Sequence, residues 1–395
     1  MILALLFLAP LAQPQDPPSD AWPMFRGPGG LGVAHHSNAP RAWNGTSGEN
    51  VRWKVAIPKR GTSSPITWGG RIFLTGSDAA SRDVYAFDAK DGALAWKHEV
   101  TLAAGELPKI MEDTTYSPAT MATDGERVYA IFVTGDVVAL TTDGKKVWGI
   151  NLGVPKNDYG HTSSLAVHAG RVLVQFDSQT GGRFIALDAA TGRIAWDQPR
   201  EVKDSWASPI LVKTGLGMEA ILVALPNVIS HDALTGKVLW TVECMKGQVE
   251  PASSAAFAGG ITFAVTDRAK MTAIRDGKIL WQYDEDLPDV SSPVAKGKYV
   301  LMASSGGVIT CLEAATGKKL WLKECDDGFL SSPVIVGDVV YLMDTTGVTR
   351  VFKLGDAYEE LHLNALGEKA VCTPAIPEGR IYIRTDKHLY CIAGR

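Results

Sequence analysis

Acidic residues recur just ahead of a short, polar, Pro-containing signature that is repeated along the chain. Three of them lie five residues before the third position of the signature, and the others lie close to it. These residues are Asp113, Asp158, Asp204, Glu250, Asp289 and Asp327. Carboxylate oxygens that converge on one point bind hard cations such as Ca²⁺. Ordinary solvated loops are the alternative interpretation, so the spacing assigns no metal.

Aromatic and basic side chains occur in the same stretches and widen the candidate set. The added residues are Arg60, Tyr116, His161, Trp206, Phe329 and Lys369. If all these connections open on one face, they form a surface that could bind a ligand or a partner. The sequence contains no Gly-x-Ser-x-Gly, no His-Glu-x-x-His and no phosphate-cradling Gly loop, so no catalytic residue is assigned.

An internal repeat sets the elements that must position these residues. Each copy of the repeat contains, in order, an apolar residue, Asp, two spacers, Thr/Asp-Gly-Lys/Arg and a Trp. Successive Trp residues lie 40 to 52 positions apart. The Gly turn between alternating apolar runs is typical of a β-hairpin. One copy shows four strands, at residues 290–295, 299–303, 308–313 and 320–324. Such a sheet cannot bury both of its faces alone, so the copies are expected to stack radially.

Eight copies can be counted. Their signatures lie at residues 63–65, 116–118, 163–165, 207–209, 253–255, 291–293, 331–333 and 372–374. We place them at the mouth of the central channel, because Pro is tolerated where a strand begins or faces an edge. The seventh copy has Leu361 near the Trp position. The eighth has only three strands, and residues 50–57, with Trp53, supply the fourth.

The sequence therefore predicts an all-β, eight-bladed propeller of four-stranded antiparallel blades, closed by its N-terminal strand. The repeat Trp rings are expected to pack on the neighbouring blade, with each N–H donating to a backbone acceptor. These structural residues are Trp53, Trp96, Trp148, Trp196, Trp240, Trp281 and Trp321.

The N-terminus divides into two segments before the ring. Residues 1–15, apolar and then polar, are interpreted as a signal peptide. Residues 16–49 form an arm, and residues 50–395 form the propeller. The arm either packs on the propeller or covers one channel mouth with Trp22, Phe25 and Arg26. No second apolar segment is long enough to span a bilayer.

Composition narrows the functional classes. The formal net charge of −4 argues against a nucleic-acid binder, which usually carries a basic face. Cysteines occur at positions 244, 311, 325, 372 and 391, an odd number whose spacing fits no zinc site. We expect them to be buried thiols.

The repeat Ala-x-Asp-x-x-Thr-Gly-x-x-x-Trp resembles that of pyrroloquinoline-quinone (PQQ) alcohol dehydrogenases and of the outer-membrane assembly factor BamB. The segment Trp22-Pro-Met-Phe-Arg26-Gly-Pro is similar to the opening of secreted PQQ-like propellers that are numerous in planctomycetes. The dehydrogenases also carry a vicinal Cys-Cys pair, which this chain lacks. No catalytic residue can therefore be carried over.

The resemblance implies an exported protein, periplasmic or secreted and monomeric, that serves as a non-catalytic scaffold. It would bind an envelope protein or peptide at a loop face, as BamB does. The alternative is an oxidoreductase dependent on PQQ or Ca²⁺, or a degenerate relative that still binds a small ligand. No cofactor is assigned, and PQQ and Ca²⁺ are the candidates.

Overall fold

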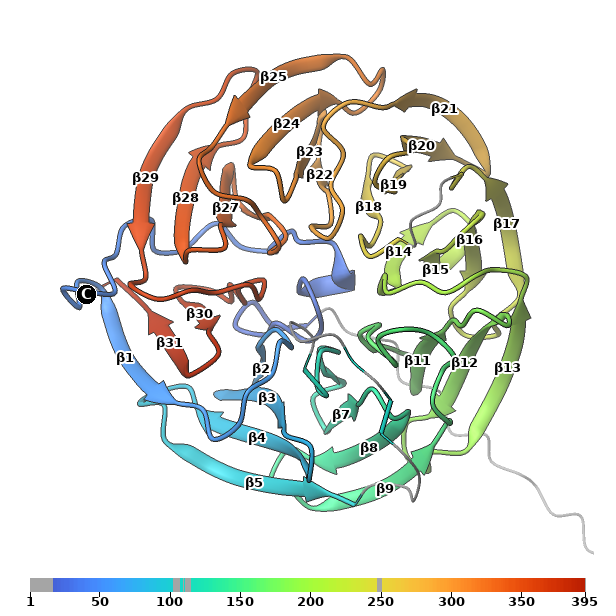
Figure 1. Cartoon of the computed structure of the whole chain (residues 1–395), viewed down its shortest axis with the longest axis vertical. Helices are drawn as coiled ribbons and strands as arrows, with labels where there is room; N and C mark the ends of the chain where they lie inside the picture. Colours follow the sequence, from blue (N-terminus) through green and yellow to red (C-terminus); the bar gives the residue numbers. More distant parts are fainter. Residues whose placement is uncertain (1–16, 102–106, 109, 111–114, 247–250, 395) are drawn as a thin grey trace, which may run out of the picture.

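The computed structural model describes residues 17–101, 107–108, 110, 115–246 and 251–394. Eight antiparallel β-sheets surround a central axis, and the chain passes through them in order around the ring (Figure 1). This arrangement confirms the predicted all-β, eight-bladed propeller. Within the described residues the one helical element is a short 3₁₀ turn, η1 (Pro28–Gly30).

The first four blades each contain four strands, numbered in order from the axis outward. Blade 1 has β2 (Ile66–Trp68), β3 (Arg71–Ser77), β4 (Arg82–Asp88) and β5 (Leu94–Val100). Blade 2 has β6 (Ala122–Thr123), β7 (Arg127–Ile131), β8 (Asp136–Thr141) and β9 (Lys146–Asn151). Blade 3 has β10 (Ala166–His168), β11 (Arg171–Phe176), β12 (Gly182–Asp188) and β13 (Ile194–Arg200). Blade 4 has β14 (Ile210–Thr214), β15 (Gly217–Val223), β16 (Asn227–Asp232) and β17 (Val238–Glu243).

The last four blades complete the ring. Blade 5 has β18 (Ala256–Ala258), β19 (Ile261–Val265), β20 (Met271–Arg275) and β21 (Lys278–Tyr283). Blade 6 has β22 (Val294–Lys296), β23 (Tyr299–Ala303), β24 (Val308–Glu313) and β25 (Lys319–Glu324). Blade 7 has β26 (Val334–Val336), β27 (Val339–Met343), β28 (Val348–Lys353) and β29 (Glu360–Ala365). Blade 8 has β30 (Ile381–Arg384), β31 (His388–Ile392) and the N-terminal β1 (Val51–Ala56), with Ala375 bridged to Tyr382 on the axial side.

Burial explains the two sequence patterns seen in each blade. The second strands are apolar almost throughout, as in β19 and β27, because both of their faces pack against neighbouring blades. The outermost strands alternate, and β1 reads half-buried, exposed, half-buried along its length, because one of its faces meets solvent. The predicted strands at 299–303 and 308–313 are confirmed, whereas the first strand of that blade covers only Val294–Lys296.

The strand register locates the Trp position of the seventh blade. In seven blades the Trp lies opposite a residue of the third strand, as Trp96 does opposite Ala86, with a register shift directly beside it. In blade 7 the residue at that point, opposite Val351, is His362, and Leu361 lies one residue earlier.

A chain of hydroxyl groups links the blades around the axis. In each link, the backbone N–H of one hydroxyl residue donates to the side-chain oxygen of the next, over 2.9 to 3.1 Å. The links run through Ser64, Thr120, Ser164, Ser208, Ser254, Ser292, Ser332 and Thr373. The predicted signature of blade 2 is wrong by three residues. Thr120, and not Ser117, holds the equivalent position, because a Ser-Pro pair happens to precede it.

The repeat Trp residues lock each blade to the next. The ring of Trp148 packs on Gly192, which has a positive φ and no room for a Cβ, and its Nε1 donates to the Ala189 carbonyl at 3.0 Å. Five other repeat Trp residues likewise donate to a carbonyl of the following blade. Trp240 differs, because its Nε1 donates to Glu219 of its own blade. The hairpin that it faces, at Gly277, is two residues shorter than the corresponding hairpins of blades 1, 3, 4 and 6.

Residues 17–49, which we call the arm, cross the axis and touch blades all around the ring (Figure 1). Trp22 bridges Thr67 of blade 1, the Pro23 carbonyl accepts from Thr123 of blade 2, and η1 packs on β14 of blade 4. Arg26, fully buried, donates to the carbonyls of Ala255 at 3.0 Å and of Pro293. The arm thus packs on the propeller, with Trp22 and Arg26 buried, and crosses its axis (Figure 1), while Phe25 is only half-buried.

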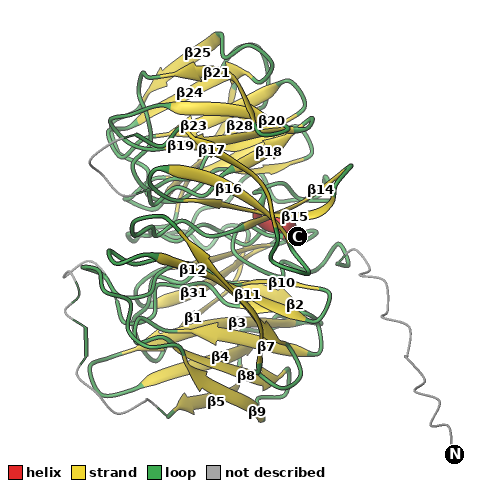
Figure 2. Ribbon diagram, turned by 90° about the vertical axis from the view of Figure 1, so that its right-hand side faces the viewer, coloured by secondary structure: helices red, strands yellow, loops and turns green. Residues whose placement is uncertain are grey.

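The propeller consequently has two unlike faces. The arm lies on one of these faces (Figure 2). There the Asn38 carbonyl accepts a hydrogen bond from the backbone N–H of Gly379, in the turn between the first and second strands of blade 8. We call this the arm face. The opposite one, the loop face, carries the connections between blades and the turns between second and third strands. In the described part of the chain, no helix has the length and apolar character needed to cross a membrane.

Candidate functional site

Several sequence-predicted residues lie on the loop face with their side chains in solvent or at the surface. Arg60, Asp158 and Lys369 are exposed, and Arg60 forms an ion pair with Asp386 at 3.1 Å. Asp289 and Asp327 are half-buried. The carboxylate of Asp289 accepts hydrogen bonds from the amide and hydroxyl of Ser305, so it joins the connection before blade 6 to the β23–β24 turn.

Other predicted residues are buried instead of lining a channel mouth. Phe329 is fully buried in the core between blades 6 and 7, next to Gly328, which has no room for a Cβ against the Ser305 carbonyl. His161 and Asp204 are 3% exposed, and the His161 Nε2 lies 2.9 Å from the Ser163 carbonyl. Tyr116 is half-buried under the Arg82 guanidinium, 4.4 Å from its ring centre.

The described residues do not fit the cation site that the acids suggested. Asp113 and Glu250 lie outside the described residues. Among those described, no three or more His, Cys, Asp or Glu side chains gather as a metal ion would need. A Ca²⁺ site takes six to eight oxygen ligands. The described carboxylates, such as Asp158 and Asp289, belong to separate loops. The described residues therefore indicate no Ca²⁺- or PQQ-dependent step.

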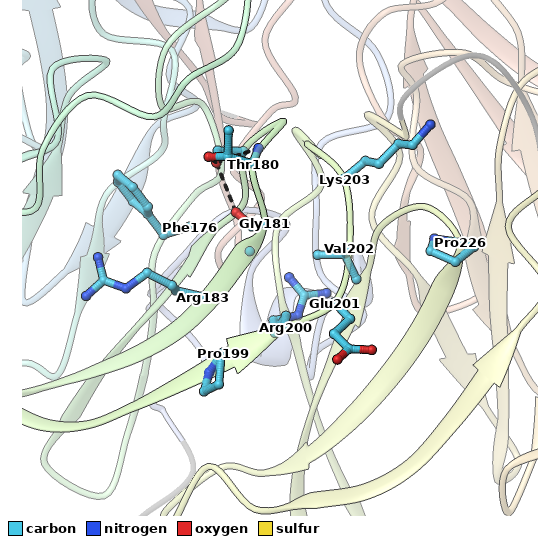
Figure 3. Close-up of a pocket in the computed structure, with 12 residues that line it drawn as sticks. Phe176, Thr180, Gly181, Arg183, Pro199, Arg200, Glu201, Val202, Lys203 and Pro226 are labelled. Carbon is cyan, nitrogen blue, oxygen red and sulfur yellow. Dashed lines mark hydrogen bonds between the residues drawn. The ribbon is translucent and has the colours of Figure 1, made fainter.

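The loop face does contain a pocket of about 760 Å³ between blades 3 and 4 (Figure 3). Three segments form it: the turn from β11 to β12, the end of β13 with the residues that follow, and the turn from β15 to β16. Its lining residues are Phe176, Ser178, Thr180, Gly181, Gly182, Arg183, Pro199, Arg200, Glu201, Val202, Lys203 and Pro226. The pocket thus combines apolar and charged groups from two blades.

A buried ion pair forms the inner wall of this pocket. Arg200 donates from Nη1 to Asp177, and both side chains are at most 1% exposed. Gln175 donates to the same carboxylate at 2.7 Å. Burial raises the pKa of Asp177, while the charge of Arg200 opposes that shift. Since a buried ion pair loses much energy if one partner is removed, Asp177 and Arg200 fix each other's position.

Aromatic side chains support the pocket from behind. The His161 ring stacks on Phe176 with centres 5.4 Å apart, and Tyr159 meets Trp206 edge-on at 4.8 Å. Burial lowers the pKa of His161 to about 4, so this imidazole is neutral at pH 7. Of the predicted residues, His161 therefore packs behind the pocket through Phe176, while Trp206 packs on Tyr159, and neither is among the lining residues.

Sequence reasoning missed the charged residues that do line the pocket. Arg183 and Arg200 lie at the start of β12 and the end of β13, and not ahead of the repeated signature, whereas Lys203 lies ahead of it, directly before Asp204, and was passed over. One signal was present, since blade 3 alone ends its outer strand with Pro199-Arg200 next to the turn glycines Gly181 and Gly182.

The cysteine thiols supply no reactive group. All five are free, and four of them are buried. Burial raises the pKa of Cys244, Cys372 and Cys391 to about 11 and that of Cys311 to about 12. Since the thiolate is the reactive form, these cysteines are poor nucleophiles at pH 7.

Comparison with known proteins places these features in a family. A family model described as outer membrane protein assembly factor BamB matches residues 29–160, 134–284 and 285–357. The BamB of Moranella endobia (strain PCIT) is 26% identical over 294 residues, which is 71% of this chain and 69% of that protein. A polyvinylalcohol dehydrogenase of Sphingopyxis is 25% identical over 238 residues, 49% of this chain and only 35% of the dehydrogenase.

Solved structures show the same fold at low identity. BamB from Moraxella catarrhalis superposes with a TM-score of 0.66 and 14% identity, covering 87% of this chain and 97% of that one. A quinohemoprotein alcohol dehydrogenase from Comamonas testosteroni gives 0.71 and 13%, covering 95% and 80%. At such identities the likeness concerns the fold alone.

Proposed function

Because the chain belongs to the outer membrane protein assembly factor BamB family, we propose that it is an exported, non-catalytic scaffold. Its loop face would bind a protein or peptide partner in the periplasm or outside the cell. The proposed signal peptide, residues 1–15, lies outside the described residues. A rigid ring that presents variable loops is suited to binding, since loops tolerate change while the scaffold holds their ends.

The difference between the two faces is the observation that carries this proposal. The arm lies across the axis on one face and engages its strands through Trp22, Arg26 and Ala34. The loop face carries the pocket between blades 3 and 4 and the exposed charges of Arg60, Lys203 and Lys369. Surface that is concave and of mixed polarity favours specific binding.

Site-specific photocrosslinking in cells tests the proposal. A photoreactive amino acid is introduced at Asp158, Lys203 or Lys369 on the loop face, and at Leu216 on the arm face as a control. We expect a discrete adduct with the same partner from loop-face positions and none from Leu216. Equal adducts from both faces, or adducts from Leu216 alone, would contradict the assignment of the loop face. Cell fractionation of the same strains tests export.

A PQQ- or Ca²⁺-dependent oxidoreductase is the second candidate, favoured by the match to polyvinylalcohol dehydrogenase. The test is a titration of the purified protein with PQQ, with and without Ca²⁺. Binding is measured as quenching of the fluorescence of its 11 Trp residues. The scaffold proposal expects no saturable quenching. Saturable binding that needs Ca²⁺ and has a Kd near micromolar, about −8 kcal/mol, would favour the oxidoreductase.

A further inference from the structure

The pocket between blades 3 and 4 contains a cationic group with unused bonding capacity. Arg200 is 4% exposed and uses Nη1 for Asp177, while its Nε and Nη2 have no partner among the described residues. A buried guanidinium that leaves N–H groups unpaired loses hydrogen-bond energy, which an acceptor in the pocket would restore. Lys203 adds an exposed ammonium at the rim, on the blade 4 side (Figure 3).

Two other charged residues, Arg183 and Glu201, line the pocket. Arg183 is neutralised by Asp197, which accepts from its Nε at 3.1 Å. Glu201 is exposed and, in Figure 3, points away from Lys203, on the other side of Val202. An anionic group that enters beside Lys203 therefore meets its ammonium on the side of Val202 away from the Glu201 carboxylate (Figure 3).

The apolar part of the pocket is rigid and lies next to these cations. Phe176 and Val202 are each 7% exposed, and Pro199 and Pro226 present fixed rings from two blades. Proline and packed aromatic rings lose little conformational entropy when a ligand binds. A ligand that fits must therefore carry an apolar group directly beside an acceptor of negative charge.

We propose that this pocket binds an acidic peptide segment, in which an Asp or Glu carboxylate lies next to an apolar side chain. The proposal rests on the proposed scaffold function and names the chemistry of its partner. A carboxylate matches the planar guanidinium fork, and a polypeptide supplies acidic and apolar groups on adjacent residues. The net charge of −4 disfavours a nucleic acid as the ligand.

Fluorescence polarisation with defined peptides tests this inference on the full-length protein. The probes are three labelled eight-residue peptides in which Leu alternates with Glu, Gln or Lys. We expect saturable binding of the Leu/Glu peptide, at least about tenfold tighter than of the Leu/Gln peptide, because tenfold corresponds to one good charged contact. Raising the NaCl concentration from 50 to 500 mM weakens the binding, since exposed charge pairs are screened.

A matched pair of charge reversals separates the pocket from the general field of the protein. Lys203→Glu is expected to weaken the Leu/Glu peptide about tenfold or more. Lys213→Glu makes the same charge change at an exposed site near the β14–β15 turn on the arm face, and leaves binding within about twofold. Thermal melting of both variants checks that neither has lost its fold.

The outcomes distinguish this inference from the proposed function. Equal binding of the Leu/Gln and Leu/Glu peptides, or equal losses in both variants, overturns the acidic-peptide assignment. If loop-face crosslinks persist in Lys203→Glu cells at wild-type yield, the scaffold function stands and the pocket is not its binding site. If crosslinks are absent from the loop face altogether, the scaffold function itself fails.

Discussion

Buried imidazoles are the residues of this propeller whose behaviour is most sensitive to pH. His231 occupies a repeat position that is Phe87, Leu187 or Ile274 in other blades, directly after the residue paired with Trp. It is fully buried, lies 4.9 Å from Phe184, and bonds the Gly236 carbonyl through Nδ1. Burial lowers its pKa to about 4, so a polar group stands in an apolar position and is neutral at pH 7.

This burial makes the protein less stable in acid. The pKa of His231 is lower in the folded than in the unfolded chain, so between about pH 6.5 and 4 the unfolded chain binds more protons. Stability is therefore unaffected by His231 above about pH 6.5 and falls as the pH drops toward 4. The contribution is at most roughly 3 kcal/mol, from about 1.4 kcal/mol per pKa unit.

Replacing the imidazole by an apolar group should remove this loss. We expect His231→Leu to match the wild type in urea unfolding at pH 7.5 and to lose less stability between pH 6.5 and 4. His362→Gln removes an exposed histidine and should follow the wild-type pH dependence. If His231→Leu shows the full acid loss, other groups, such as His161, account for it.

At the scale of elements, the inner strands are held in register by the hydroxyl chain as well as by packing. Each link satisfies a buried N–H of one blade with a side chain of the next, as in the bond from Ser254 N to Ser292 Oγ at 3.0 Å. Thr120 and Thr373 serve as well as the serines, so the requirement is for a hydroxyl and not for serine.

A conservative pair of substitutions tests this link. Ser292→Ala leaves the Ser254 N–H buried and unpaired, and is expected to cost about 1–3 kcal/mol of unfolding free energy. Ser292→Thr keeps the acceptor and should cost much less. Urea denaturation followed by Trp fluorescence measures both. A Thr variant as unstable as the Ala variant would show that packing volume, and not the hydroxyl, is what matters.

The repeated elements could be predicted because each depends on local chemistry. Gly turns, alternating outer strands and a Trp at a fixed distance are all legible along the chain, and the strands of blade 6 match closely. The errors arose where position depends on other blades. The Ser117-Pro118 pair resembles the signature, but only the hydrogen bonds around the axis identify Thr120 as its true equivalent.

The site was less predictable than the fold for a similar reason. Residues such as Phe329 and His161 occur in polar loops, yet their burial depends on where the next blade lies. The pocket is formed by three segments from two blades, and its Arg200 is paired with Asp177, 23 residues earlier in the chain. Sequence spacing alone does not indicate such pairs.

On the scale of the whole molecule, the N-terminal residues perform two separable tasks. β1 supplies the outer strand of blade 8 and pairs with β31 from Val51 to Ala56, which closes the ring. The arm lies across the axis and fixes Trp22 and Arg26 in buried positions. Closure removes the exposed sheet edges that an open ring would have.

Two truncations separate these tasks. Deleting residues 17–49 should give a folded protein that melts cooperatively at a lower temperature, since the ring stays closed. Deleting residues 17–57 removes β1 as well, and we expect loss of cooperative melting together with association through the open edge. Circular dichroism and size-exclusion chromatography measure both. Similar behaviour of the two variants would mean that β1 adds nothing beyond the arm.

The place where the arm begins also gives the molecule a direction. Ser19 bonds Glu378 through its carbonyl and its hydroxyl, in the turn of blade 8 that lies on the arm face. A tether that held the protein through the residues before Ser19 would pull on the arm face and leave the loop face turned outward. The side bearing Arg200 and Lys203 would then face partners that approach from the direction opposite to the tether.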